Sequence, residues 1–399
     1  MAGLGGPLGT GDMRSANIVD YNISTDIMRL VKDKTPAMNY VLGKATRKES
    51  VDTPEWFWFE DDNYTWHWQL SLSTYGSADV TLTIADNTYL KVGDLLKNPS
   101  TGEVIRITAK DAGGYTITVV RAATFSATYG GSGPSSILTT DYLVMIGNVN
   151  QEGGALPSAI QTVESRKYGG VQEIRDPFKL TWVLEATKLY TGDPNKQEPI
   201  KMAIQHALKM ERLALFGEYR LDLSVAGSAR FPARYSHGLL ANCGGTTNVA
   251  GPLTEDAWEF FLEDAFRWCA NKKQKLFLCS RRIATYLNSF AREKIQVVQD
   301  KSTYGVRIQR MESAHGTVDI AVHDMLEQGY SGYGIMVDVP LCKWRPQEGN
   351  GKNLDTQLID HGSISGESAN TYEYYTVAGL EVRGGSSSYP HHYKMYGVT

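Results

Sequence analysis

The densest apolar pattern in the chain is a run of aromatic residues between positions 56 and 68. Seven of these thirteen positions are aromatic: Trp56, Phe57, Trp58, Phe59, Tyr64, Trp66 and Trp68. The tryptophans alternate in two arms, which is the period of an extended strand, and the acidic residues at 60–62 separate the arms. Such rings bury roughly 150 to 250 Å² each, so the run carries on the order of 1,000 Å² of apolar surface that must be covered.

Two kinds of cover fit this strand. It is either buried in the core of its own domain or partly covered by a neighbouring subunit. Aromatic residues on both faces of a strand need two partners, and the pattern by itself leaves both interpretations open. The second one assigns an assembly interface to Trp56, Trp58, Trp66, Trp68, Phe57 and Phe59.

Residues 77–149 have the pattern of a separate β module. Turn clusters at 98–102 and 111–114 separate short alternating runs at 79–84, 103–108, 115–120 and 142–146. We expect a small all-β barrel or sandwich. Because residues 159–167 and 171–184 again read as extended segments, the module is predicted to be inserted at the tip of a long hairpin. The aromatic strand would be the outgoing limb of that hairpin.

Helical spacing dominates the middle of the chain. The longest signal covers 195–216, where apolar residues recur at spacings of three and four: Ile200, Ala203, Ile204, Ala207, Leu208, Ala214 and Leu215. Further helices are predicted at 255–270 and 281–291, with strands at 276–279, 295–298, 304–311, 317–322 and 334–339. Residues 250–345 therefore form a mixed α/β unit. A polar connection at 347–369 is expected to be loop, before a closing strand at 372–383.

Composition describes an ordinary soluble globular protein. The chain of 399 residues is 42% hydrophobic and 21% charged, with a net charge of -4, which argues against a dedicated role on nucleic acid or on a membrane surface. No run of eighteen apolar residues predicts a membrane span. The Gly-rich start reads as a flexible arm rather than a secretion signal. The four cysteines form no CxxC pair, so neither a zinc site nor a disulfide is expected.

No catalytic or metal-binding signature accompanies the aromatic run, so we predict no enzyme, no cofactor and no metal. Gly43-Lys44 and Gly351-Lys352 lack the following Ser or Thr of a phosphate-binding loop. His391 and His392 are neighbours that would face apart on a strand, and His315 and His323 are expected to make ordinary hydrogen bonds. The rival class is an aromatic-lined carbohydrate-binding module or glycosidase. It is disfavoured because adjacent carboxylates at 61–62 face apart rather than across a bond.

The parts follow one another as flexible arm, hairpin limb, return limb, long helix, α/β unit and closing strand. Three stretches sharpen this order: TPAMNYVLG at 35–43, HGTVDIAVHDML at 315–326 and YYTVAGLEVR at 374–383. Together they resemble the major capsid proteins of tailed bacteriophages, with the HK-ninety-seven-type fold. The resemblance implies an α+β fold with an N-terminal arm (1–50), an extended loop hairpin (51–76 and 150–184), an inserted β module (77–149), a peripheral domain (185–249 and 346–399) with spine helix 195–216, and an axial domain (250–345).

The resemblance also implies a function. Copies of the chain would form hexamers and pentamers of an icosahedral shell that encloses packaged double-stranded DNA, assembled in the bacterial cytoplasm and found in the virion. Its partners would be itself, portal, scaffolding and decoration proteins, and the DNA through weak non-specific contact. Some relatives crosslink through a loop lysine; Lys44, Lys48 and Lys167 are candidates by location, and we expect them to be ordinary solvated lysines. An encapsulin-like nanocompartment shell shares the fold and stays the alternative.

Overall fold

A computed structural model of the chain describes residues 48–399, apart from 62–64, 71–73, 127, 129, 154–156, 158, 189–192, 223–231, 271–272, 295–297, 300–307, 328 and 364–365. Of 291–294, 298–299 and 308–309 it describes the backbone alone. Several sequence-based expectations lie outside the described residues: most of the arm at 1–50, the stretch at 35–43, Lys44, Asp62 and Tyr64. The strands predicted at 295–298 and 304–311 are described only in part.

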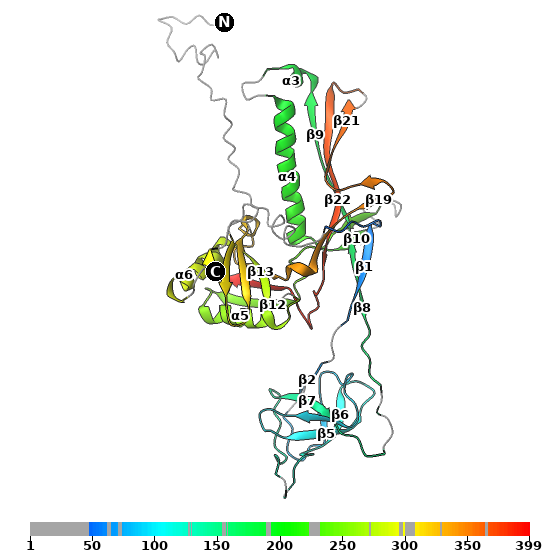
Figure 1. The fold of residues 1–399 in the computed structure, drawn as a ribbon, viewed down its shortest axis with the longest axis vertical. Helices are drawn as coiled ribbons and strands as arrows, with labels where there is room; N and C mark the ends of the chain where they lie inside the picture. The colour runs from blue at the N-terminus through cyan, green and yellow to red at the C-terminus, as the bar shows by residue number, and fades with distance from the viewer. Residues whose placement is uncertain are drawn as a thin grey trace, which may run out of the picture. The chain divides into compact units, whose positions relative to one another are not determined.

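The chain forms two compact units, which Figure 1 draws as a ribbon. One unit takes the residues up to Trp58 together with Lys167–Thr399, and the other is Phe59–Arg166. Two strands, β1 (Glu55–Glu60) and β8 (Ser165–Gly170), pair as a two-stranded sheet where the chain leaves the first unit and returns to it. Helices and sheets occur together in the first unit, so the predicted α+β class is confirmed. None of the described helices is long and apolar enough to cross a membrane.

The unit Phe59–Arg166 is a small antiparallel barrel. Its strands are β2 (His67–Gln69), β3 (Thr81–Thr83), β4 (Asp94–Lys97), β5 (Val104–Lys110), β6 (Thr116–Val120) and β7 (Tyr142–Asn148). They are ordered β2-β7-β4-β5-β6-β3, and a bridge between Leu70 and Ile84 brings the two ends of that order together. Apolar residues on alternate strand positions fill the interior, among them Leu82, Leu96, Ile105 and Ile117. Because β2 belongs to this sheet, the sheet begins before residue 77.

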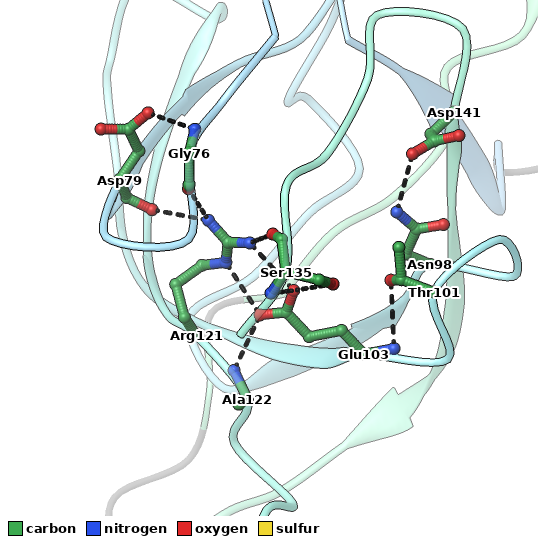
Figure 2. Close-up of polar contacts among 9 residues, drawn as sticks. All are labelled: Gly76, Asp79, Asn98, Thr101, Glu103, Arg121, Ala122, Ser135 and Asp141. Carbon is green, nitrogen blue, oxygen red and sulfur yellow. Dashed lines mark hydrogen bonds and ion pairs between the residues drawn. The ribbon is translucent and has the colours of Figure 1, made fainter. Parts of the chain in front are cut away.

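A buried ion pair fastens the loops at one end of this barrel (Figure 2). The Glu103 carboxylate receives two hydrogen bonds from the Arg121 guanidinium, at 2.8 and 2.9 Å, and one from the backbone N–H of Ala122 at 2.9 Å. It also accepts from the backbone N–H of Ser135 at 3.1 Å, while Arg121 donates to the carbonyl of Gly76 at 2.7 Å. Two charges removed from water are tolerable here because nearly every donor and acceptor is satisfied. The pair therefore ties four separate segments of the barrel unit together.

The other unit contains a mixed seven-stranded sheet. Its order is β12 (Gly245–Gly251), β23 (Tyr393–Val398), β17 (Gly334–Val337), β13 (Gln274–Cys279), β16 (Thr317–Val322), β15 (Ile308–Glu312) and β14 (Val298–Gln299). Two helices, α5 (Glu255–Arg267) and α6 (Arg281–Lys294), pack into the core on the sheet. The sheet thus takes two strands, β12 and β23, that mostly lie outside the 250–345 range expected for the α/β unit. Strand β23 lies between β12 and β17 and pairs with both.

Helix α5 forms because its two ends and its inner face are all satisfied. The Thr254 hydroxyl caps the start by accepting from the Ala257 N–H at 3.2 Å. At the other end, the buried Lys275 ammonium donates to the carbonyls of Ala265 and Trp268, each at 2.6 Å. These carbonyls belong to the last turn, which has no helical partners of its own. The inner face is fully apolar: Trp258, Phe261, Leu262, Ala265 and Phe266.

A second sheet runs along the long helix α4 (Pro194–Phe216), which lies beside β9 and β22 in Figure 1. Its order is β18 (Cys342–Pro346), β22 (Ala369–Val382) and β21 (Gln357–Ser363), and β9 (Gln172–Thr181) pairs with β22 over ten residues. Short elements complete the unit: α3 (Trp182–Ala186), β10 (Arg220–Asp222), β11 (Ala233–Tyr235), η1 (Asp324–Leu326), η2 (Val339–Leu341), β19 (Glu348–Gly349) and β20 (Lys352–Asn353).

The expectation of a loop at 347–369 is wrong, since β19, β20 and β21 lie within it. Strand β21 is mostly exposed and has the sequence QLIDHGS, so it shows no regular apolar alternation. It is held instead by backbone pairing with the much longer β22, from Gln357 opposite Tyr375 to Ser363 opposite Asn370. A strand that is stabilised mainly by backbone pairing with a neighbour needs no apolar alternation in its own sequence, so the sequence does not predict it.

We expect Glu103→Ala to destabilise the barrel unit by about 3–5 kcal/mol, because it leaves the Arg121 guanidinium buried without its carboxylate. Hydrogen exchange in β5 and β6 would measure this, and exchange in α4 and α5 of the other unit should stay unchanged. Glu152→Ala, at an exposed position of the same unit, is the matched control and should change stability by less than about 0.5 kcal/mol. Equal exchange in the two variants would contradict a structural role for the pair.

Candidate assembly surface

Strand β1 turns its aromatic side chains alternately inward and outward. Trp56 and Trp58 are 9% and 7% exposed, whereas Phe57 and Phe59 are 54% and 56% exposed. The period-2 alternation predicted from the sequence is therefore present. One aromatic face of the strand is covered by the chain itself, and the other is accessible.

The inward face is locked into the core of its own unit. Trp56 and Trp58 pack with the buried apolar side chains Val51, Val171 and Val377. The Trp56 ring also lies against the backbone at Gly169 and Gly379, where a Cβ atom would come within 2.6 and 2.7 Å of ring atoms. No other residue fits at such a distance, so these two glycines are required by the ring. The Arg345 guanidinium lies 5.8 Å from the centroid of the ring.

The second arm of the aromatic run divides in the same way. Trp68 is 4% exposed and belongs to the core of the barrel, whereas Trp66 is 60% exposed. The Trp66 ring contacts the His67 ring at a centroid distance of 5.3 Å, and His67 lies 5.9 Å from Tyr142. Of the six residues predicted at an assembly interface, the core interpretation thus applies to Trp56, Trp58 and Trp68. Phe57, Phe59 and Trp66 keep an accessible side chain.

The long helix α4 is positioned by polar contacts that the sequence did not predict. His206 Nδ1 lies 2.7 Å from an oxygen of Asp176, and Lys209 pairs with the other oxygen of that carboxylate. His206 Nε2 lies 2.6 Å from the Thr376 hydroxyl on β22. The predicted apolar stripe is buried only at its end, at Ala214 and Leu215, and the other side chains buried on the helix are Pro194, His206 and Glu211. In the sequence, His206 and Glu211 look like residues of a solvent-exposed helix face, so no sequence signal predicted that they are buried.

A second buried pair joins α4 to the segment after β16. The backbone N–H of Met325 donates to His323 Nδ1 at 3.0 Å, so that nitrogen is the acceptor. His323 Nε2 then carries the proton and donates to Glu211 at 2.6 Å. The expected hydrogen-bonding role of His323 is confirmed. His315 is more exposed and lies 3.9 Å from Glu259.

The expectation that His391 and His392 face apart applies to a strand, but β23 begins after them at Tyr393, and both side chains contact Asp338. His392 is buried, accepts from the Asp338 N–H at 3.2 Å and donates to the Arg383 carbonyl at 2.8 Å. Burial lowers the pKa of His392 to about 4, so the imidazole is neutral. His391 Nδ1 lies 3.5 Å from the Asp338 carboxylate. Among the described residues, no group of three or more His, Cys, Asp or Glu side chains is arranged to hold a metal ion.

The comparison with protein families decides what kind of protein presents this surface. The model of the family described as SU10 major capsid protein matches residues 9–388. The chain belongs to this family of major capsid proteins. The identification of a tailed-phage major capsid protein, made from the order of the parts, is therefore confirmed. This capsid protein is a structural component of the virion, and its copies assemble into a shell.

Solved structures give weaker similarities. The capsid of Myoviridae phage XM1 is 9% identical with a TM-score of 0.48, over 99% of this chain and 100% of that one. A structure from Mycobacterium phage Bobi is 8% identical with a TM-score of 0.47, over 98% and 99%. The holo-SrpI encapsulin complex from Synechococcus elongatus is 12% identical with a TM-score of 0.39, over 60% and 78%. The search of curated proteins finds no match. Similarities at this level do not discriminate between virus and nanocompartment, so the family match carries the identification.

The buried His392 should make this capsid protein sensitive to acid. Its folded-state pKa of about 4 lies below the ordinary value of 6.5, so its stabilising effect is complete above pH 6.5 and is lost as the pH falls towards 4. We expect a loss of about 3 kcal/mol over this range. His392→Gln keeps a donor and an acceptor without titrating, and urea unfolding of the two proteins at pH 7 and pH 4 should show a smaller loss for the variant. Equal losses would mean that other groups control the acid sensitivity.

Proposed function

We propose that this capsid protein forms hexamers and pentamers of an icosahedral shell around packaged double-stranded DNA, and that the β1/β8 hairpin reaches onto a neighbouring copy. The observation that carries the proposal is the accessible pair Phe57 and Phe59, on a strand whose opposite face is fixed by Trp56 and Trp58. A strand locked on one side presents its other side in one orientation. That arrangement suits a contact that must be repeated identically in many copies.

The two phenylalanines supply a useful but modest free energy. With each ring carrying roughly 150 to 250 Å² and more than half of it exposed, covering both removes about 200 Å² from water. At ~25 cal/mol per Å² this stabilises a contact by about 5 kcal/mol, before the entropic cost of association. One such contact is weak by itself. Repeated around a closed ring, it makes the shell cooperative while single subunits remain soluble.

When the β1/β8 hairpin of one copy contacts a neighbouring copy, the two copies contribute different surfaces to the interface. Such heterologous contacts close into rings when the rotation between copies is the right fraction of a turn. The same subunit then serves in rings of five and of six, provided that the hairpin adjusts slightly. This supports the assignment of 51–76 and 150–184 as the extended loop and of 1–50 as the arm. The inserted module predicted at 77–149 then also takes β2, and the axial domain predicted at 250–345 also takes β12 and β23, which leaves the rest of 185–249 and 346–399 to the peripheral domain.

The net charge of the chain is compatible with a shell protein that surrounds packaged DNA. A net charge of -4 over 399 residues keeps phosphate attraction weak, so contact with the packaged genome is non-specific. Assembly would take place in the bacterial cytoplasm with scaffolding and portal proteins, and decoration proteins would join the finished shell. A shell that carries an enzyme cargo instead of DNA would point to the nanocompartment alternative.

We expect Phe57→Ser with Phe59→Ser to leave the subunit folded and to reduce particle yield by at least tenfold, because the contact loses most of its apolar area. Electron microscopy and sedimentation of the purified chain would measure particles, and circular dichroism would report folding. The matched control is Ile200→Ser with Leu358→Ser, at two exposed apolar positions outside the proposed extended loop, and should assemble normally. Full assembly of the phenylalanine variant would refute the proposed contact.

A further inference from the structure

The outer face of the barrel carries a second accessible surface, formed by strands β2, β7, β4 and β5. The pairing register aligns His67 with Val144 and Lys97 across three strands, and Gln69 with Tyr142 in the next row. Arg106 on β5 stands opposite Leu95 on β4. Residues paired in this way share a face, and the alternate positions of the same strands point into the core. The module therefore presents aromatic, apolar and cationic side chains side by side.

The strands of this face carry cations outward and bury their only acid, Asp94, and the acids that directly precede β5 and β7 are buried as well. Asp94, Glu103 and Asp141 are all buried, and each accepts hydrogen bonds from the barrel itself. The exposed charged residues on the four strands are Lys97, Arg106 and Lys110. None of these three forms an ion pair within the described part of the chain. A one-signed surface of this kind attracts a partner of opposite charge.

The rings on the face are arranged for contact with protein rather than for stacking. The plane of His67 is inclined by 73° to that of Trp66 and by 55° to that of Tyr142. Bases and sugars stack on parallel rings that form a flat platform, which these angles do not provide. Aromatic residues and Arg at varied angles are typical of the centres of protein–protein interfaces. The complementary partner for this face is therefore an acidic protein surface with an apolar side chain at its centre.

The outer face of helix α5 has that chemistry. Phe260 is 67% exposed although the opposite side of the helix is buried. Four exposed carboxylates lie on the same outer stripe, within one turn of Phe260: Asp256, Glu259, Glu263 and Asp264. Two basic side chains lie near them: Arg267 is 3.7 Å from Asp264, and His315 is 3.9 Å from Glu259. Glu259 and Glu263 are like charges four residues apart, which weaken an isolated helix by about 0.2–0.5 kcal/mol, so this pair does not serve folding.

We propose that the cationic aromatic face of the barrel in one copy docks on the acidic face of α5 in a second copy. The inference rests on the proposed function, because it needs copies assembled side by side. Lys97 and Arg106 would face the α5 carboxylates, and Phe260 would enter the cluster of Trp66, His67 and Tyr142. Opposite charges guide the approach and fix the register, and the apolar centre holds the contact once water is excluded. The inserted module would thus clamp neighbouring subunits.

Reversing the charges tests the contact. We expect Lys97→Glu with Arg106→Glu, and separately Glu259→Lys with Glu263→Lys, to slow assembly by about tenfold at low salt. The chain carrying all four substitutions should return to within about threefold of the wild-type rate, because the complementarity is restored. Light scattering would follow assembly, and circular dichroism would verify folding. The matched control, Lys352→Glu with Glu348→Lys, changes exposed charges elsewhere and should have no effect.

A disulfide test locates the contact between copies. Chains with Lys97→Cys are mixed with chains carrying Glu263→Cys, and non-reducing gels should show a crosslinked dimer that neither variant forms alone. Any one of three results would overturn this inference: unchanged assembly of both charge-reversed variants, no rescue in the chain with all four substitutions, or no crosslinked dimer. If these results come with normal wild-type particles, the proposed shell stands. If the wild-type chain forms no particles, the proposed function fails, and the disulfide test on the concentrated soluble protein still decides the contact.

Discussion

The packing of Trp56 against bare backbone is the constraint on which the rest of the surface depends. The ring sits where Gly169 and Gly379 leave room for it, and the cluster of Val51, Val171 and Val377 encloses its neighbour Trp58. Because side chains alternate along a strand, fixing the tryptophans inward also fixes Phe57 and Phe59 outward. An intramolecular contact thereby decides which apolar surface this capsid protein offers to others.

The framework behind that strand is held by buried polar contacts as much as by apolar packing. His206 and Glu211 connect one side of α4 to Asp176 and the other to His323. Such contacts add little net stability, because removing charges from water costs nearly as much as the pairing returns. They do exclude alternative positions, since a shifted helix would leave the same groups buried without partners. A subunit that repeats in a shell needs this kind of unique geometry.

Burial of acids shapes the surface of the barrel as well as its stability. Glu103 and Asp141 are buried and accept hydrogen bonds from loops, which leaves Lys97, Arg106 and Lys110 as the exposed charges of β2, β7, β4 and β5. Burial raises the pKa of Glu103, but the hydrogen bonds from Arg121, Ser135 and Ala122 hold it below its ordinary value, so the carboxylate stays ionised near neutral pH. The interior network and the exterior charge pattern are therefore two consequences of the same residues.

The sequence by itself determined the features that depend on local order: the alternation in β1, the helices near α4, α5 and α6, the β-rich character of the module and, through the order of the parts, the capsid family. Tertiary structure decided what covers each surface. Val377 and Gly379 lie more than 300 residues from Trp56, so no local pattern reports that they enclose it. Likewise β21 exists because β22 pairs with it, and His206 is buried because Asp176 and Thr376 meet it there. Burial is a property of contacts between distant segments, whereas periodicity is a property of one segment.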